Sequence, residues 1–416
     1  MMAGCANLVS SCWVYISKIG LLFLICVVFS APAQRTADAP PLIIAIGDVH
    51  GDFDDLCLIL KRVGLVDEKL HWAGNHAILV QTGDLLDRGP KERQVLDLVR
   101  SLEEESAKAG GQVVSLLGNH EMMNLIGYLR YVTPDIYASF SAPDSDARRR
   151  AAYDEFVKWQ KNNAQLLQVT RDPTFDMTES QWMASHPLGF IEQRQAFAPN
   201  AVYGSWVRGR PAVSKISAIL FVHGGIAPEI ASLTIEDINR RIRAEMELFE
   251  EMKQYLIAER LILPFFTLQE ITAIVKDVYV AGKESNAPAD EKRMATLAPY
   301  LKLSTWLCIR EDGPLWFRGY DEWSDAQGVP QVEKILSSYD ASEIVVGHTV
   351  QKVAHIRSRF NDRVLLIDTG MVASSARAGA ASALEIRDAE KFTAVYLAGQ
   401  ELLFDRGTVH AVPKNN

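Results

Sequence analysis

The sequence predicts an α/β fold, because short apolar runs alternate with stretches of helical periodicity from Pro41 onward. Each run is rich in Ile, Val and Leu and ends in a cluster of Gly, Asp, His or Asn, which is typical of strands buried on both faces. Hydrophobic residues make up 48% of the chain and charged residues 23%, as in soluble globular proteins. The 416 residues allow one large decorated domain or two domains.

The predicted elements follow one another in a regular order. Six runs are predicted strands, at 42–46, 77–80, 113–117, 218–222, 344–346 and 364–367. Two intervening segments have apolar residues at helical spacing, namely Leu56, Ile59, Leu60 and Val63, and Val95, Leu98, Val99 and Leu102. Near the C-terminus, residues 383–386, 393–397 and 402–404 predict strands without helices between them. We expect these three strands to form the far end of a second sheet.

Two long stretches, at about 128–211 and 235–303, interrupt the series. We interpret them as helical insertions in one catalytic core spanning 41–405, where they would cover one rim of the site. An independent helical domain is the alternative, but the strand series resumes after each stretch. Five aromatic residues, Trp182, Trp206, Trp306, Trp316 and Phe190, are candidates for that rim, although aromatic side chains more often belong to a core.

Residues 1–33 differ from the rest of the chain. One lysine, Lys18, precedes the apolar run 19–29, and Ala31 and Ala33 form an A-x-A cleavage pattern. This predicts a signal peptide and a secretory or export route, with a membrane anchor as the alternative if the leader is retained. Only Cys57 and Cys308 lie beyond the leader, so they either pair or are independently buried thiols.

The formal net charge of −9 argues against nucleic acid as a partner, because nucleic-acid binding needs a basic surface. An anionic substrate is still compatible with this charge, since a local metal centre outweighs the global charge. Oligomeric state has no recognisable sequence signal.

Five predicted strand ends carry residues of the kinds that bind metals. They are Asp48 and His50 in GDVHG, Asp84 in GDLLDRG, Asn119 in GNHE, His223 in HGG and His348 in GHT. A single such residue is more often a turn former. Five in series, each flanked by glycine, indicate a site at one edge of the sheet, where the carboxyl ends of parallel strands meet. Imidazole, carboxylate and amide oxygen together suit Mn, Fe or Zn rather than calcium.

The ordered motifs resemble those of the calcineurin-like metallophosphoesterase superfamily, in its phosphoprotein phosphatase branch. GPLWFR at 313–318 and IDTG at 367–370 are similar to the Shewanella-like protein phosphatases. The resemblance implies a two-sheet β-sandwich core flanked by helices and two metal ions. Asp84 would bridge them, with Asp48 and His50 on one ion and Asn119, His223 and His348 on the other. Val350 stands where many relatives have a second histidine, so the first ion would have three protein ligands.

Hydrolysis of a phosphate monoester also needs an acid for the leaving oxygen and donors for the phosphate. His120 follows the ligand Asn119 directly, and Asp87 could orient its ring and raise its pKa, which would make His120 the general acid. Two metals can clamp a phosphate and activate a water. Arg88 and Arg318 match the family's two phosphate-binding arginines and would supply planar donors.

The predicted function is therefore a binuclear-metal protein phosphatase that acts on a phosphoprotein or phosphopeptide. The resemblance slightly favours phosphotyrosine over phosphoserine or phosphothreonine, and manganese as the metal. A hydrolase of dinucleoside polyphosphates or other small phosphoesters is the alternative, because such enzymes share the first three motifs. A catalytically inactive phosphate-binding module is a more remote alternative, which would predict eroded metal ligands, whereas all six are present.

Overall fold

The computed structural model describes residues 40–170, 173–283, 288–372 and 379–407, which belong to one compact unit from Pro40 onward. The predicted signal peptide at 1–33 lies outside the described residues. Among the helices in the described ranges, none is both long and apolar enough to cross a bilayer. Cys57 and Cys308 are both free thiols, the first partly exposed and the second buried.

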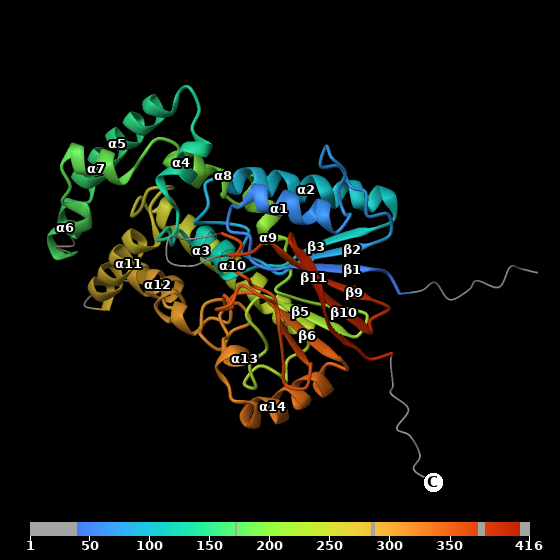
Figure 1. The fold of residues 1–416 in the computed structure, drawn as a ribbon. Helices are drawn as coiled ribbons and strands as arrows, with labels where there is room; N and C mark the ends of the chain where they lie inside the picture. Colours follow the sequence, from blue (N-terminus) through green and yellow to red (C-terminus); the bar gives the residue numbers. More distant parts are fainter. Residues whose placement is uncertain (1–39, 171–172, 284–287, 373–378, 408–416) are drawn as a thin grey trace, which may run out of the picture. The chain divides into compact units, whose positions relative to one another are not determined.

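The first sheet has six strands in the order β11-β10-β9-β1-β2-β3. Its parallel part consists of β1 (Ile43–Ile46), β2 (Ile78–Gln81) and β3 (Gln112–Ser115). The antiparallel part consists of β9 (Ser382–Arg387), β10 (Lys391–Tyr396) and β11 (Gly399–Asp405), and β9 pairs with β1. The expectation that the C-terminal strands end a second sheet is therefore wrong, because they extend the first sheet beside β1 (Figure 1).

The second sheet has five strands in the order β4-β5-β6-β8-β7. Strands β5 (Ile219–Val222), β6 (Glu343–Val346) and β8 (Val364–Leu366) are parallel. Strands β4 (Val213–Ile216) and β7 (Arg357–Arg359) are antiparallel to their neighbours at the two edges. The predicted two-sheet α/β fold is thus confirmed, and each parallel strand contains part of a predicted apolar run.

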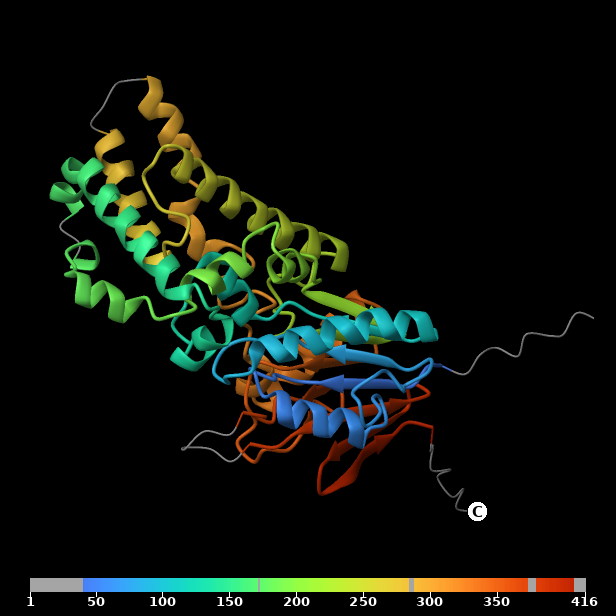
Figure 2. The ribbon, with the colours of Figure 1, turned by 90° about the horizontal axis from the view of Figure 1, so that it is seen from above.

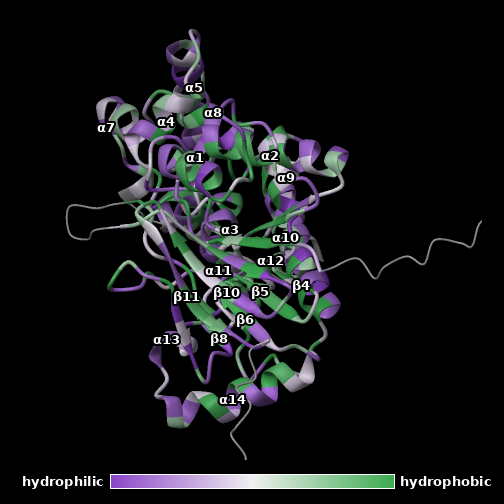
Figure 3. Ribbon diagram, turned by 45° about the vertical axis from the view of Figure 1, so that its right-hand side comes forward, coloured by the Kyte–Doolittle hydropathy of each residue, from purple (hydrophilic) through white to green (hydrophobic). Residues whose placement is uncertain are grey.

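The two sheets enclose a hydrophobic layer. Alternate residues of each central strand point inward, because successive side chains of a strand lie on opposite faces. In β1, Ile43 and Ala45 belong to the cluster that also contains Phe221 and Val345 of the second sheet, whereas Ile44 and Ile46 belong to the cluster beneath the helices. Both faces of the parallel strands are therefore buried, which explains their continuous apolar sequences. Figure 3 shows hydrophobic residues gathered in the strands at the middle of the molecule.

Helices cover the outer faces of both sheets. Helices α1 (Phe53–Arg62), α2 (Glu92–Ala109) and α3 (Asn119–Ile126) follow the first three strands. Helices α13 (Gly319–Glu322) and α14 (Asp325–Ser338) lie on the side of the second sheet (Figure 1). The predicted helical faces are observed except at Val63, which lies just past the end of α1 and is partly exposed. The buried predicted residues are Leu56, Ile59 and Leu60 of α1 and Val95, Leu98, Val99 and Leu102 of α2.

The stretch at 128–211 contains six α-helices and a 3₁₀ turn in its described part. They are α4 (Pro134–Phe140), α5 (Ser145–Asn162), α6 (Ala164–Thr170), η1 (Pro173–Phe175), α7 (Glu179–Ser185), α8 (Phe190–Ala196) and α9 (Val202–Arg208). The stretch at 235–303 contains α10 (Ile235–Ala258), α11 (Leu268–Lys283) and α12 (Pro288–Leu297), followed by η2 (Tyr300–Thr305). Figure 2 shows these helices side by side at one end of the sheets.

The helices of the two stretches share one core. Trp159 of α5 lies edge-on against Phe266, with ring centroids 4.8 Å apart, and its indole N–H donates to the Leu261 carbonyl at 3.0 Å. Phe156 is fully buried in the same cluster. The two stretches therefore pack on each other, and a cavity between them, described below, is built from both.

One histidine in this helical part makes stability depend on pH. His186 stacks on Trp182 at 3.9 Å, and its Nδ1 donates to the Trp182 carbonyl, while its buried Nε2 has no partner among the described residues. Burial lowers the pKa of His186 from 6.5 to about 4. Because protonation is disfavoured only in the folded state, stability is fully present above pH 6.5 and declines as the pH falls towards 4.

We expect His186→Phe to reduce this acid sensitivity. Between pH 7 and pH 5 the histidine should contribute about 2 kcal/mol to the fall in unfolding free energy, measured by urea denaturation. The variant should lose correspondingly less stability over that interval than the wild type. His76→Gln, at an exposed side chain, is the control and should track the wild type. Equal pH slopes for wild type and His186→Phe would contradict the assignment.

Candidate metal centre and active site

The predicted metal-binding residues converge at the carboxyl ends of the parallel strands of both sheets. Asp48 and His50 follow β1, Asp84 follows β2, and Asn119 begins α3 directly after β3. His223 and His348 follow β5 and β6 of the other sheet. All six side chains are at most 6% exposed, so the structure brings together every predicted ligand in one buried cluster.

Asp84 lies at the centre of this cluster. Its Oδ2 lies 3.6 Å from His50 Nε2, and its Oδ1 lies 3.3 Å from His223 Nε2. Two groups of potential ligand atoms share it, His50 with Asp84 and His120, and Asp84 with His223 and His348. Within each group the atoms lie within 4.8 Å of one another. Asp48 Oδ2 lies 3.7 Å from His50 Nε2, and Asn119 Oδ1 lies 2.8 Å from His223 Nε2.

Backbone carbonyls orient two of the histidines. Nδ1 of His50 donates to the Leu86 carbonyl at 2.8 Å, and Nδ1 of His223 donates to the Thr82 carbonyl at 2.9 Å. With the proton held on Nδ1, each ring presents the lone pair of Nε2 to the carboxylates, which is the orientation that metal-binding histidines need.

The loops that carry these residues have a strained backbone. His50, Asp84, Asp87, Arg88 and His348 all adopt positive φ, between 48° and 69°. Non-glycine residues rarely adopt this conformation, and it tends to occur at functional sites. Gly118 is needed for packing, because a Cβ there would lie 2.3 Å from Asp84 Oδ1. At Gly83, which has a φ of 100°, a Cβ would lie 2.6 Å from the backbone nitrogen of Gly118.

Several buried polar atoms of the cluster are unsatisfied within the described residues. They are Nε2 of His50, Nε2 of His348 and Oδ2 of Asp368, which follows β8. Buried polar atoms almost always have a partner, so their convergence needs an explanation. Two transition ions fit this donor set, because imidazole nitrogens and carboxylate oxygens meet around one shared carboxylate.

The pKa shifts of the site are also consistent with metal binding. Burial raises the pKa of Asp48, and the neighbouring Asp368 and Asp84 charges raise it further. Burial also lowers the pKa of His50 to about 3. Burial alone would raise the pKa of Asp84, but His223, His120 and His50 hold this pKa well below its ordinary value. These shifts favour a neutral His50 beside an ionised Asp84, which are the protonation states in which the two groups bind a metal ion.

His120 and Asp87 form a close pair beside the cluster. His120 Nδ1 donates to Asp87 Oδ2 at 2.6 Å, and Asn124 donates to the other Asp87 oxygen at 2.9 Å. Burial lowers the pKa of His120, but the Asp84 charge and the hydrogen bond to Asp87 outweigh this and raise the pKa above 6.5. Its Nε2 faces the site, 3.8 Å from Asp84 Oδ2.

The two predicted phosphate-binding arginines are both exposed and contact different residues of the site. Arg88 Nη2 lies 3.3 Å from His120 Nε2, and its guanidinium lies over the Tyr131 ring at 5.9 Å. Arg318 Nη1 donates to Thr349 Oγ1 at 3.1 Å, next to His348. Each arginine is held near a different group of ligands.

Sequence reasoning missed the acidic residues that support these loops. Glu121 of GNHE accepts hydrogen bonds from the backbone N–H groups of Asp84, Leu85 and Gly118, each at 2.8 Å. Burial and the Asp84 charge raise its pKa to about 7. Glu92 accepts from the Asp87 N–H at 2.8 Å, and burial raises its pKa to about 8. The glutamate in GNHE was a visible signal, whereas Glu92 lies in no motif.

The aromatic rim was predicted only in part. Trp316 lies edge-on to His348 with ring centroids 6.0 Å apart, so it does border the cluster. Trp182 and Phe190 are buried inside the helical part, and Trp306 is buried as well. The Arg210 guanidinium lies 4.6 Å from the centroid of the Trp206 ring, and the indole N–H of Trp206 donates to the Glu103 carboxylate. Tyr131, which was not predicted, lies 5.0 Å from the His120 ring.

Comparison with known proteins places this geometry in a family. The model of the calcineurin-like phosphoesterases matches residues 41–352. Shewanella-like protein phosphatase 1 of Plasmodium berghei is 29% identical over 339 residues, covering 79% of this chain and 67% of the relative. Shewanella-like protein phosphatase 2 of Arabidopsis thaliana is 26% identical over 368 residues, covering 85% and 77%.

Among solved structures, a cold-active protein-tyrosine phosphatase of a psychrophilic Shewanella species has a similar fold. The TM-score is 0.54 at 22% sequence identity, over 88% of this chain and 80% of that one. The family model covers most of the chain and includes the loops that carry all six predicted metal ligands. The chain therefore belongs to the calcineurin-like phosphoesterase family.

Proposed function

We propose that the protein is a binuclear-metal phosphomonoesterase that removes phosphate from phosphoproteins. The observation that carries this proposal is the position of Asp84, which is shared by two groups of ligand atoms and lies next to the His120–Asp87 pair. Asp84, Asp48 and His50 would hold one ion, and Asp84, Asn119, His223 and His348 the other. Manganese is the proposed metal. When bound, the two ions would polarise the phosphate and lower the pKa of a water.

His120 is proposed to give a proton to the leaving oxygen rather than to bind metal. Its Nδ1 donates to the Asp87 carboxylate, which stabilises the protonated ring and leaves Nε2 facing the substrate. The Arg88 guanidinium lies 3.3 Å from that nitrogen, where its positive charge disfavours a metal ion. When Arg88 turns to a substrate phosphate, Nε2 becomes free to carry the proton. The raised pKa keeps a useful fraction of His120 protonated near neutral pH.

Arg88 and Arg318 are proposed to bind the phosphate oxygens from two sides. We expect Arg88→Ala to lower kcat/KM by about 10²-fold, because a positioned donor for developing charge typically contributes that much. Arg88→Lys should recover only part of the loss, since an ammonium cannot bind in the bidentate manner. Arg100→Ala on α2, whose guanidinium lies over Tyr203, is the control. The kcat/KM of all three variants is measured by steady-state hydrolysis of a phosphotyrosine peptide. An unchanged kcat/KM for Arg88→Ala would show that Arg88 does not bind the phosphate.

Phosphotyrosine is proposed as the preferred substrate. Tyr131 is 38% exposed and lies beside His120 and Arg88, and Trp316 borders His348. These rings offer an aromatic leaving group apolar contacts on both sides of the cluster, which an alkyl phosphate would use less. Entry into a secretory or export route is proposed from residues 1–33 alone, with a membrane anchor if that segment is retained.

The test is phosphate release from matched peptides carrying phosphotyrosine, phosphoserine or phosphothreonine, with diadenosine tetraphosphate as a fourth substrate and Mn²⁺ present or omitted. The proposal predicts Mn-dependent release from the peptides, fastest with phosphotyrosine, and a selective loss of that advantage in Tyr131→Ala. Preference for diadenosine tetraphosphate would favour a small-molecule hydrolase instead. No release from any substrate with added metals would overturn the enzymatic proposal.

A further inference from the structure

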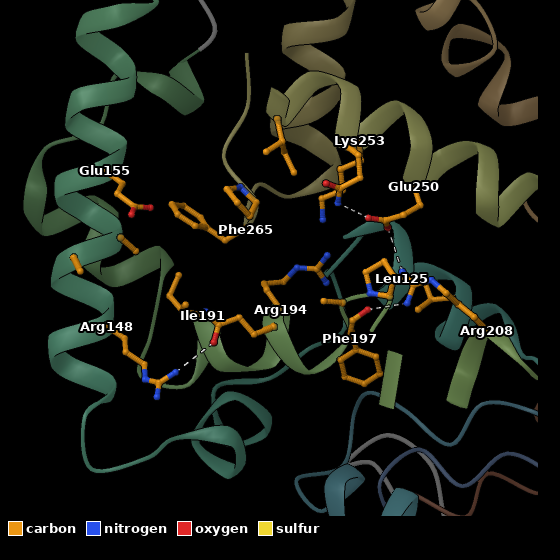
Figure 4. A pocket seen from close by; sticks show the side chains of 18 residues that line it. Leu125, Arg148, Glu155, Ile191, Arg194, Phe197, Arg208, Glu250, Lys253 and Phe265 are labelled. Carbon is orange, nitrogen blue, oxygen red and sulfur yellow. Dashed lines mark hydrogen bonds and ion pairs between the residues drawn. The ribbon is translucent and has the colours of Figure 1, made fainter. Parts of the chain in front are cut away.

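A cavity of about 350 Å³ lies between the two helical stretches (Figure 4), and none of its lining residues is a predicted metal ligand. Helices α5 and α8 of the first stretch form one side, and α10 with the segment around Phe265 forms the other. Its apolar wall includes Leu125, Ile191, Phe197, Ile257 and Phe265. The volume falls within the range of sites that bind small organic ligands.

The polar part of the lining is predominantly basic. Four lining side chains are basic, namely Arg148, Arg194, Arg208 and Lys253, and two are acidic, namely Glu155 and Glu250. Arg208 pairs with Glu250 at 3.3 Å, and Arg148 pairs with Asp144 at 2.8 Å. No carboxylate of the described residues lies within 4 Å of the charged nitrogens of Arg194 or Lys253. Neither cation is therefore in a direct ion pair, although the Glu250 charge acts on both of them.

Arg194 is the more deeply buried of these two cations. It is 7% exposed, and its Nε is buried without a hydrogen-bond partner among the described residues. Nη1 donates to the Asn124 carbonyl at 2.8 Å, so one nitrogen of the guanidinium is fixed to α3. An incompletely satisfied buried guanidinium is costly, and a ligand carboxylate beside it in the cavity would add a charge-assisted bond.

Lys253 of α10 faces the same cavity (Figure 4). Burial lowers the pKa of its amine to about 8, and Arg194 contributes because the two positive charges repel each other. Burial likewise lowers the pKa of Arg194 to about 10. An anion bound between them would relieve both the repulsion and the desolvation.

We propose that this cavity is a binding site for a small amphipathic carboxylate, whose charged group contacts Arg194 and Lys253 and whose apolar body lies against Ile191 and Phe265. The carboxylate fits the donors because a guanidinium edge and an ammonium can each engage its oxygens. The apolar wall selects a chain or ring over a small inorganic anion. This site does not depend on the phosphatase activity.

Isothermal titration of the metal-loaded protein with octanoate tests the proposal, with acetate and octylammonium as comparison ligands. Octanoate should bind one per chain, acetate much more weakly because it lacks the apolar body, and octylammonium not at all. Acetate also reports any carboxylate binding to the metal centre. No saturable binding of octanoate, or equal binding of octylammonium, would overturn the proposal.

The variant Lys253→Met tests whether octanoate binds in this cavity. The variant should weaken octanoate about tenfold or more, because it removes one of the two cations that face the carboxylate. It should also fold normally, with a melting temperature at or above that of the wild type, since it removes a desolvated charge. Arg240→Met is the matched control on the same helix, at a side chain that is 77% exposed. Arg194→Met provides a second variant, and octanoate affinity unchanged in both would place the ligand elsewhere.

Discussion

Asp84→Asn is expected to abolish nearly all phosphatase activity, by about 10³-fold or more, because it removes the carboxylate proposed to be shared by both metal ions. The substitution keeps the shape of the side chain and an oxygen for the backbone N–H of His120, which now donates to Asp84 Oδ1 at 2.9 Å. The loss should therefore appear as reduced metal content, measured by elemental analysis after dialysis, and not as unfolding.

The same variant should also change the stability of the metal-free protein. His223, His120 and His50 hold the pKa of Asp84 well below its ordinary value, so the ionised carboxylate stabilises the metal-free fold. Removing that charge should lower the melting temperature of the metal-free protein below that of metal-free wild type, while the variant stays folded at the assay temperature. Asp54→Asn, at an exposed carboxylate on α1, is the control. Full metal content together with full activity in Asp84→Asn would contradict the role of Asp84.

His120→Asn is expected to retain metal but to lower kcat for a phosphoserine peptide by about 10²- to 10⁴-fold, the usual contribution of a general acid. The loss should be much smaller for 4-nitrophenyl phosphate, because nitrophenolate leaves without a proton. This difference between leaving groups distinguishes a proton donor from a residue that only shapes the site. His355→Asn, at an exposed histidine, should behave as wild type.

The pH dependence of kcat gives an independent test of the same residue. A general acid must be protonated, so kcat for the phosphoserine peptide should fall as the pH rises through the pKa of His120. Asp87 raises that pKa, and Asp87→Asn should therefore move the decline to lower pH. Equal losses on both substrates in His120→Asn, or a decline that Asp87→Asn does not move, would argue against the acid role.

Much of this site could be predicted because the relevant signal is local. Each parallel strand is a short apolar run, and the residues just beyond it necessarily lie at the carboxyl edge of the sheet. Asp48, Asp84 and His348 were therefore expected to lie close together, although 300 residues separate Asp48 from His348, and the His348 N–H indeed donates to Asp48. The predicted resemblance to calcineurin-like phosphoesterases was likewise confirmed by the family match.

What the sequence did not reveal depends on contacts between distant segments. The strand at 382–387 pairs with β1, and periodicity alone cannot identify a partner so far away. The roles of Glu92 and Tyr131 similarly depend on contacts with other segments, since Glu92 binds the Asp87 N–H and Tyr131 lies against His120. The cavity around Arg194 and Lys253 forms only where helices of two separate stretches pack together, so no single segment carries its pattern.

The central claim, that two metal ions shared by Asp84 form the catalytic centre, is tested most directly by titrating metal-free protein with Mn²⁺. Bound metal and hydrolysis of a phosphotyrosine peptide would be measured on the same samples. The account predicts that activity rises with occupancy and reaches its maximum when two ions are bound per chain, and that Asp84→Asn does not reach that state. Full activity in metal-free protein, or full occupancy by two ions without hydrolysis, would contradict it.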